Sequence, residues 1–224
     1  MRPTPGANSP DRPPDPDQPR AEEGALIARL REGRAAPDDW AILVRAHQDR
    51  IYATCLRMVG RPDLAADLTQ DTFVKAIQGV QAFDGQSAFS TWLTRIAMNL
   101  CLTHFRAAKV RDRAVAQASR LGIARSSDSD RAATHFREHA GPSRVEQDET
   151  RGALSQALGS LDADQRAILV LRDVQGLDYD HIAAALEIAV GTVKSRLFRA
   201  RLALRQALDA AAETPGRSSP PATS

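Results

Sequence analysis

The stretch GTVKSRLFRARLALRQAL, residues 191 to 208, is the most informative part of the sequence for the fold. It has the pattern of an amphipathic helix, with one large apolar residue on the polar face. At about 100° per residue, an α-helix gathers its regularly spaced apolar residues on one stripe. Basic side chains flank this stripe, and Phe198 projects among them, well away from the apolar positions. The residues of the stripe are Val193, Leu197, Ala200, Leu204 and Leu208. The pattern therefore predicts a packed helix whose outer face carries a phenylalanine among arginines.

The residues just before this helix predict a second, shorter one. Ile182, Ala183 and Leu186 have the spacing of a short amphipathic helix, and a tight turn follows from Glu187 to Gly191. A short helix, a turn and a longer basic helix form the helix-turn-helix pattern, in which the second helix enters the major groove of DNA.

Charge is sorted between the elements of this C-terminal block. Residues 188–208 hold five basic residues and no acidic one, whereas residues 158–187 hold six acidic residues and two arginines. Charge alone also fits an ordinary surface helix with solvated arginines. Phe198 favours DNA, because thymine methyl groups offer an apolar contact inside the groove.

The rest of the chain predicts an all-α protein with two small helical domains. The net charge of +2 is too small to indicate a polyanionic partner by itself, so a nucleic-acid argument rests on local charge. Seven prolines in the first 20 residues, and a similar composition at the other end, predict disordered tails. We expect tails at residues 1–21 and 213–224, helical domains at 22–110 and 150–212, and a flexible linker at 111–149.

The first domain is expected to contain a lead helix and three longer ones, at residues 37–59, 62–80 and 88–109. On the last of these, Arg95, Asn99 and Arg106 share the outer side, with Trp92 at its edge. Arginines beside an aromatic ring suit single-stranded DNA, whose bases stack on rings. Trp92 and Phe89 are more typical of a helical core, so this pattern alone does not establish a DNA contact.

The helix at residues 62–80 has a polar face that burial does not explain. Asp67, Asp71, Lys75 and Gln78 line up at helical spacing, opposite a broad apolar arc. Their spacing fits either an ordinary solvated face with a weak ion pair or a docking face for a protein partner.

Three stretches together resemble bacterial RNA polymerase sigma factors of the extracytoplasmic-function (ECF) group: DLTQDTFVKAI, FSTWLTRIAMNLCLTHFR and LDADQRAILVLRDVQGLDYDHIAAALEIAVGTVKSRLFRARLAL. The resemblance implies a first domain that binds the polymerase core and melts the −10 promoter element. It implies a second domain, with the helix-turn-helix, that reads the −35 element as duplex.

The resemblance also assigns roles to residues. It implies −35 contacts by Lys194, Ser195, Arg196, Phe198 and Arg199. It implies −10 contacts by Phe83, Phe89, Trp92, Arg95 and Asn99, with the loop from Phe83 to Phe89 capturing a flipped base. It implies docking on the polymerase by Asp67, Thr69, Gln70, Asp71, Phe73 and Lys75. Two departures, Met98 where arginine is frequent and Thr103 where aspartate is common, bear on the −10 preference.

The expected partners are the β and β′ subunits of the polymerase core and promoter DNA, with an anti-sigma factor as a further candidate. We expect a bacterial cytoplasmic protein without membrane insertion, cofactor, metal or small-molecule substrate. Cys55 and Cys101 are interpreted as reduced core residues. A DNA-binding regulator without a polymerase role is the alternative, and an enzyme is disfavoured because no phosphate loop, metal cluster or nucleophile constellation is present in the sequence.

Overall fold

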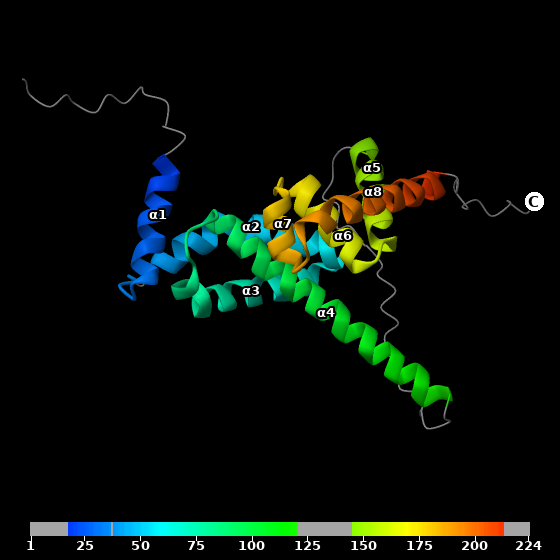
Figure 1. Ribbon diagram of the computed structural model, residues 1–224, viewed down its shortest axis with the longest axis horizontal. Helices are drawn as coiled ribbons and strands as arrows, with labels where there is room; N and C mark the ends of the chain where they lie inside the picture. The colour runs from blue at the N-terminus through cyan, green and yellow to red at the C-terminus, as the bar shows by residue number, and fades with distance from the viewer. Residues whose placement is uncertain (1–17, 37, 121–144, 213–224) are drawn as a thin grey trace, which may run out of the picture.

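The computed structural model describes residues 18–36, 38–120 and 145–212, and every regular element in them is helical (Figure 1). The prediction of an all-α fold is therefore confirmed for this part of the chain. The elements are α1 (Gln18–Arg31), α2 (Asp39–Val59), α3 (Pro62–Gly79), the 3₁₀ turn η1 (Val80–Ala82), α4 (Phe89–Arg120), α5 (Val145–Ser160), α6 (Ala163–Leu169), the π-helical turn η2 (Val170–Val174), α7 (Tyr179–Leu186) and α8 (Val190–Ala212).

Local sequence signals explain where the helices begin and end. Gly60 takes the left-handed conformation, with φ 70°, and ends α2, and Pro62 occupies the first turn of α3. The Asp162 carboxylate accepts the backbone N–H groups of Asp164 and Gln165 at 2.9 and 3.0 Å, so it caps α6. Asp178 caps α7 in the same way, accepting the backbone N–H of His181 at 2.8 Å.

The first bundle is formed by α2, α3 and α4, with α1 packed beside them (Figure 1). Leu43, Ile51, Met58, Leu93 and Met98 are fully buried at its centre. The apolar side chains of three helices converge there, which is the arrangement that the periodicity of each helix predicts. Cys55 and Cys101 lie in this core as free thiols, and the hydrogen bond with Cys55 together with burial raises the pKa of Cys101.

The second bundle is formed by α5, α6, α7 and α8. Ile168, Leu171, Ile182 and Val193 are fully buried and connect all of its helices except α5. Helices α7 and α8 pack against each other, and the turn between them lies where the sequence predicted it. The helix-turn-helix is therefore confirmed.

The two bundles pack directly on each other, which the prediction of two separate domains on a flexible linker did not include. Arg166 of α6 is only 3% exposed, and its guanidinium lies over the Phe105 ring of α4, 5.4 Å from the ring centre. It donates hydrogen bonds to the backbone oxygens of Leu158, Gly159 and Leu161, at 2.8 to 3.0 Å, and also to that of Met58 in α2. One buried arginine thus holds the start of the second bundle together and joins it to the first.

A polar contact extends the same interface. Gln175 accepts a hydrogen bond from Arg50 Nε at 2.7 Å and donates one to Thr54 Oγ1 at 2.7 Å. Arg50 and Thr54 both belong to α2, so this glutamine connects the end of η2 to the first bundle.

The helices extend past several of the predicted boundaries. Residues 18–21, expected in the N-terminal tail, belong to α1, and residues 111–120 and 145–149, expected in the linker, belong to α4 and α5. The alanine-rich composition of residues 106–120 favours helix beyond the last buried apolar residues of α4. The other residues assigned to the tails and the linker, 1–17, 121–144 and 213–224, lie outside the described part of the chain.

Candidate nucleic-acid and polymerase interfaces

The outer face of α8 is built as the sequence predicted. Val193, Leu197 and Ala200 are buried against the second bundle, whereas Phe198 is 70% exposed. The left-handed conformation of Glu187, with φ 54°, ends α7 and turns the chain towards α8. Around Phe198, four predicted site residues form the same face: Lys194, Ser195 and Arg199 are exposed and Arg196 is half-buried.

The remaining basic residues of α8 are held by carboxylates. Arg201 forms an ion pair with Asp173, with Nη2 to Oδ1 at 2.5 Å, and Arg205 lies 3.9 Å from Asp209. The pairing of Arg201 explains why the unpaired cations of the helix concentrate near its N-terminal half. A recognition helix reads base edges with that half.

The loop between α3 and α4 is anchored by an aromatic cluster. Phe83 and Phe89 are 5% and 3% exposed, and their rings meet at 5.6 Å between centroids. Each also packs on Trp92, at 5.3 and 5.4 Å, and Phe89 contacts His47 of α2. Direct −10 contacts by the rings of Phe83 and Phe89, which the resemblance implied, do not fit this burial, because both rings are enclosed in the core.

Between the two phenylalanines the backbone is exposed. Asp84, Gly85 and Gln86 face solvent, and Gly85 has φ 77°, a conformation that glycine adopts without strain. The Asp84 carboxylate accepts the backbone N–H of Gln86 at 3.0 Å and shapes the turn. The cluster therefore presents a fixed loop next to the start of α4.

A groove of about 530 Å³ runs between α3 and α4. Trp92 and Asn99 line it from α4, and Lys75 lines it from α3. Trp92 is half-buried and Asn99 is exposed, so an aromatic ring, an amide and a cation are all accessible along one groove. Arg95 is also half-buried on α4, on the same outer side as Asn99. The two departures from the family pattern lie in different surroundings. Met98 is fully buried, whereas Thr103 lines the groove.

The polar face of α3 is exposed as predicted. Asp67, Gln70, Asp71, Lys75 and Gln78 all face solvent. No ion pair links Asp71 to Lys75 among the described residues, so the carboxylates of this face are available to a partner. Thr69 is half-buried and donates to the Ala65 backbone oxygen at 2.6 Å, and Phe73 is buried. Both residues line a groove between α2 and α3.

A second groove, of about 540 Å³, lies between α2 and α3, and the sequence did not predict it. Tyr52 lines it from α2, and Gln70, Val74 and Ile77 line it from α3. Val74 and Ile77 are 43% and 48% exposed. The only signal in the sequence is that the apolar arc of α3 is wider than a single buried face requires.

Two segments of the chain match sequence families that define its class. Residues 43–111 match Sigma-70 region 2, and residues 151–204 match Sigma-70 region 4. The first covers the bundle with both grooves, and the second covers the helix-turn-helix. The chain is a sigma factor of RNA polymerase.

Relatives place it in the ECF group. It is 37% identical over 187 residues to the ECF RNA polymerase sigma factor SigE of Mycolicibacterium smegmatis, covering 83% of this chain and 67% of that protein. It is 34% identical over 197 residues to the RNA polymerase sigma-H factor of Pseudomonas aeruginosa, covering 84% and 94%. The chain belongs to the ECF sigma factors, and it directs promoter-specific initiation of transcription by RNA polymerase.

A solved structure has the same arrangement of helices. The sigma factor RpoE of Bartonella quintana, determined in complex with the anti-sigma factor NepR, matches with a TM-score of 0.55 and 27% identity. The match covers 77% of this chain and 98% of that one. In the described part of the chain, no helix combines the length and the apolar character needed to cross a membrane.

Proposed function

We propose that α8 reads the −35 element from the major groove through Lys194, Ser195, Arg196, Phe198 and Arg199. The exposed ring of Phe198 is the main support for this proposal. Exposure of an apolar ring to water is unfavourable, whereas the thymine methyl groups of the major groove would give it an apolar contact. The surrounding cations bind phosphates or guanine edges. The domains follow from this division of labour: residues 22–110 serve the −10 element and the polymerase, and residues 150–212 serve the −35 element.

The groove between α3 and α4 holds the unpaired −10 strand in this proposal. Trp92 offers a ring on which a base stacks, Asn99 offers an amide to a base edge, and Arg95 offers a charge to the backbone. Phe83 and Phe89 contribute indirectly, because their packing on Trp92 supports the exposed loop at Gly85.

Helices α2 and α3 dock on the polymerase core. The acidic residues Asp67 and Asp71 and the side chains of Gln70 and Lys75 supply a polar contact surface. The neighbouring groove with exposed Val74 and Ile77 supplies an apolar one, and aliphatic side chains left exposed together are typical of protein interfaces. Thr69 and Phe73 line the same groove and complete this surface.

The solved relative from Bartonella quintana is bound to an anti-sigma factor, and we extend the proposal to a partner of that kind for this chain. In this proposal the protein acts in the bacterial cytoplasm. It is a subunit of the polymerase and catalyses no reaction of its own.

Reconstitution tests the proposed function. The full chain is added to bacterial core polymerase, and transcripts from genomic fragments are mapped. We expect discrete start sites that share upstream elements and that core polymerase alone does not use. Transcripts without defined start sites would overturn the proposal. DNA binding by the chain without any effect on the polymerase would instead support the DNA-binding regulator.

A further inference from the structure

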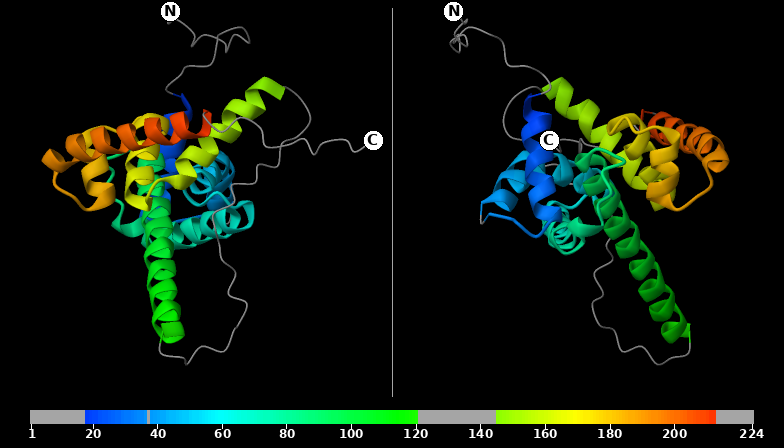
Figure 2. Two further views of the ribbon diagram at one scale, coloured as in Figure 1. Left: turned by 90° about the vertical axis from the view of Figure 1, so that its right-hand side faces the viewer. Right: turned by 60° about the vertical axis from the view of Figure 1, so that its left-hand side comes forward.

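Helix α4 continues beyond the bundle in which it begins. Its second half projects past the other helices in every view (Figures 1 and 2). From Arg106 onwards its described residues are exposed, except for half-buried Ala108 and Ala118. The segment from 106 to 118 has four cations, Arg106, Lys109, Arg111 and Arg113, and one carboxylate, Asp112. Val110 and Val115, the large apolar residues of this segment, are themselves exposed, so burial of an apolar face does not account for the charges of the segment.

Three of these cations continue the face that holds the −10 groove. At about 100° per residue, Arg95, Asn99, Arg106 and Arg113 lie within an arc of about 40°, and Lys109 lies about 40° to one side of Arg113. From Arg95 to Arg113 the helix rises about 27 Å, which equals the length of about 8 base pairs of duplex. Arg111 lies about 160° away, on the opposite side.

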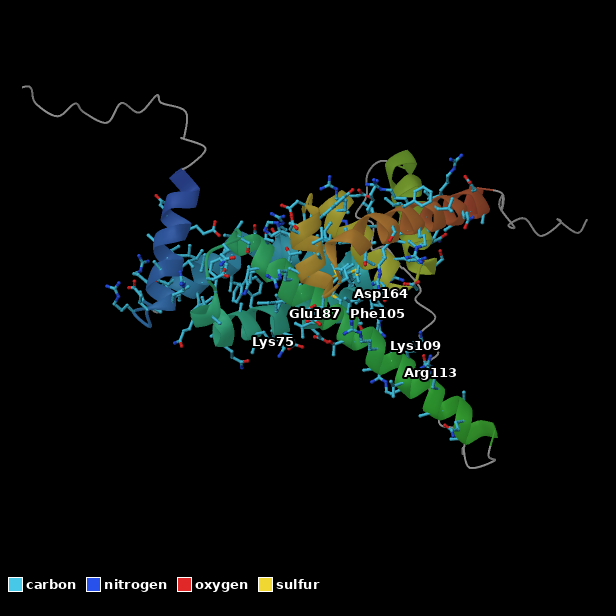
Figure 3. The ribbon with its side chains drawn as sticks, viewed as in Figure 1. Lys75, Phe105, Lys109, Arg113, Asp164 and Glu187 are labelled. Atoms are coloured by element: carbon cyan, nitrogen blue, oxygen red, sulfur yellow. The ribbon has the colours of Figure 1, made fainter. Side chains whose placement is uncertain are left out.

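The cations of this face are available to an external anion. Lys109 and Arg113 lie on the projecting part of α4, away from the two bundles (Figure 3). Neither they nor Arg106 form an ion pair with any residue that the structure describes. The face beyond Asn99 also lacks an aromatic side chain, because Phe105 is turned towards Arg166.

We propose that Arg106, Lys109 and Arg113 bind the phosphate backbone of the promoter duplex between the −10 and −35 elements. Basic residues without aromatic partners fit a stacked duplex, since single strands are bound by rings as well as charges. The inference rests on the proposed function, because it extends the strand-binding face of α4 into the adjoining double helix. The helix would lie along the duplex and contact its phosphates, which adds affinity without sequence specificity.

The chain offers a matched control for the test. Arg113→Gln and Arg111→Gln each remove one exposed cation from the same stretch of α4, on opposite sides. Glutamine forms helices about as well as arginine, so the projecting helix is preserved in both variants. Binding of reconstituted holoenzyme to a duplex carrying one of its mapped promoters is measured from 50 to 200 mM salt.

We expect Arg113→Gln and Lys109→Gln each to weaken binding about fivefold at 0.15 M salt and to lower the salt slope by about 0.9. The double variant, Lys109→Gln with Arg113→Gln, should lower the salt slope by about 1.8. Arg111→Gln should change neither the affinity nor the salt slope. The start site should stay the same in all variants. Equal effects of Arg113→Gln and Arg111→Gln would overturn the proposal. A loss seen only when the spacer is single-stranded would overturn the duplex assignment. If the unaltered holoenzyme selects no promoter, the proposed function fails and this inference fails with it.

Discussion

Leu197 and Phe198 are neighbours in the chain with opposite surroundings. Leu197 is buried in the second bundle, and Phe198 is exposed among cations. Hydrophobicity alone would place the larger ring inside. The helical period decides otherwise, because Phe198 is rotated by about 100° from Leu197, away from the single face that α8 buries.

Replacing each of these residues by alanine should therefore have opposite effects. Phe198→Ala should change the free energy of unfolding by less than about 0.5 kcal/mol and should reduce discrimination among −35 sequences. Leu197→Ala should cost about 2–5 kcal/mol without a specific effect on promoter ranking. Thermal melts beside transcription from single-base −35 mutants measure both. A strongly lowered melting temperature for Phe198→Ala with an unaltered ranking would refute the groove contact.

Asn99 allows a test of strand opening. Asn99→Ala removes an exposed amide and should leave the fold intact, but it should lower open-complex formation about tenfold on a fully paired promoter, the worth of one good hydrogen bond. On a template already mismatched at −10 the loss should be much smaller. Permanganate reactivity of the melted strand measures it, and equal losses on both templates would contradict the assignment.

At the scale of elements, α3 shows what periodicity can and cannot predict. Its polar face was predicted residue by residue, because exposed positions follow from the helical repeat. The groove beside it was not predicted, because it depends on how far α2 stands from α3. The same limit applies to Phe83, Phe89 and Phe73. A sequence shows that aromatic residues lie near a site, but only packing shows which of them are enclosed.

Charge reversal on α3 tests its docking role. Asp67→Lys combined with Asp71→Lys should weaken binding to core polymerase by at least tenfold at physiological salt, with unchanged helicity by circular dichroism. Asp209→Lys, at the far end of α8, shifts the net charge in the same direction by half as much and should bind normally. Unchanged affinity of the double variant in a titration would show that the polymerase uses another surface.

At the scale of the whole molecule, the contact between the bundles lay beyond the reach of sequence patterns. Arg166 and Gln175 look like ordinary polar residues in the sequence, yet they make the hydrogen bonds that join the two halves. Such bonds depend on which backbone oxygens the tertiary structure brings near, and no local pattern encodes this. The helices, their caps and the helix-turn-helix were predictable because each depends on residues close together in the chain.

Gln175→Ala should loosen this contact. It removes two hydrogen bonds worth about 1 kcal/mol each, and each bundle keeps its own core. Small-angle X-ray scattering of the free chain should then show a larger radius of gyration. Gln165→Ala is the control, since that side chain makes no hydrogen bond among the described residues. An unchanged radius for Gln175→Ala would mean that Arg166 and apolar packing hold the bundles together without this glutamine.

The packing of α7 between α4 and α8 also limits the reach of the free protein. Neighbouring helix axes lie 8–10 Å apart, so α8 sits about 20 Å from α4. The −35 and −10 elements, about 25 base pairs apart, are separated by about 85 Å of duplex. In this closed shape the chain can touch one element but not both, and the second contact is lost together with its affinity. For both elements to be contacted at once, the contact between the bundles has to open, so we expect the free chain to bind an isolated promoter less tightly than the chain bound to the polymerase does.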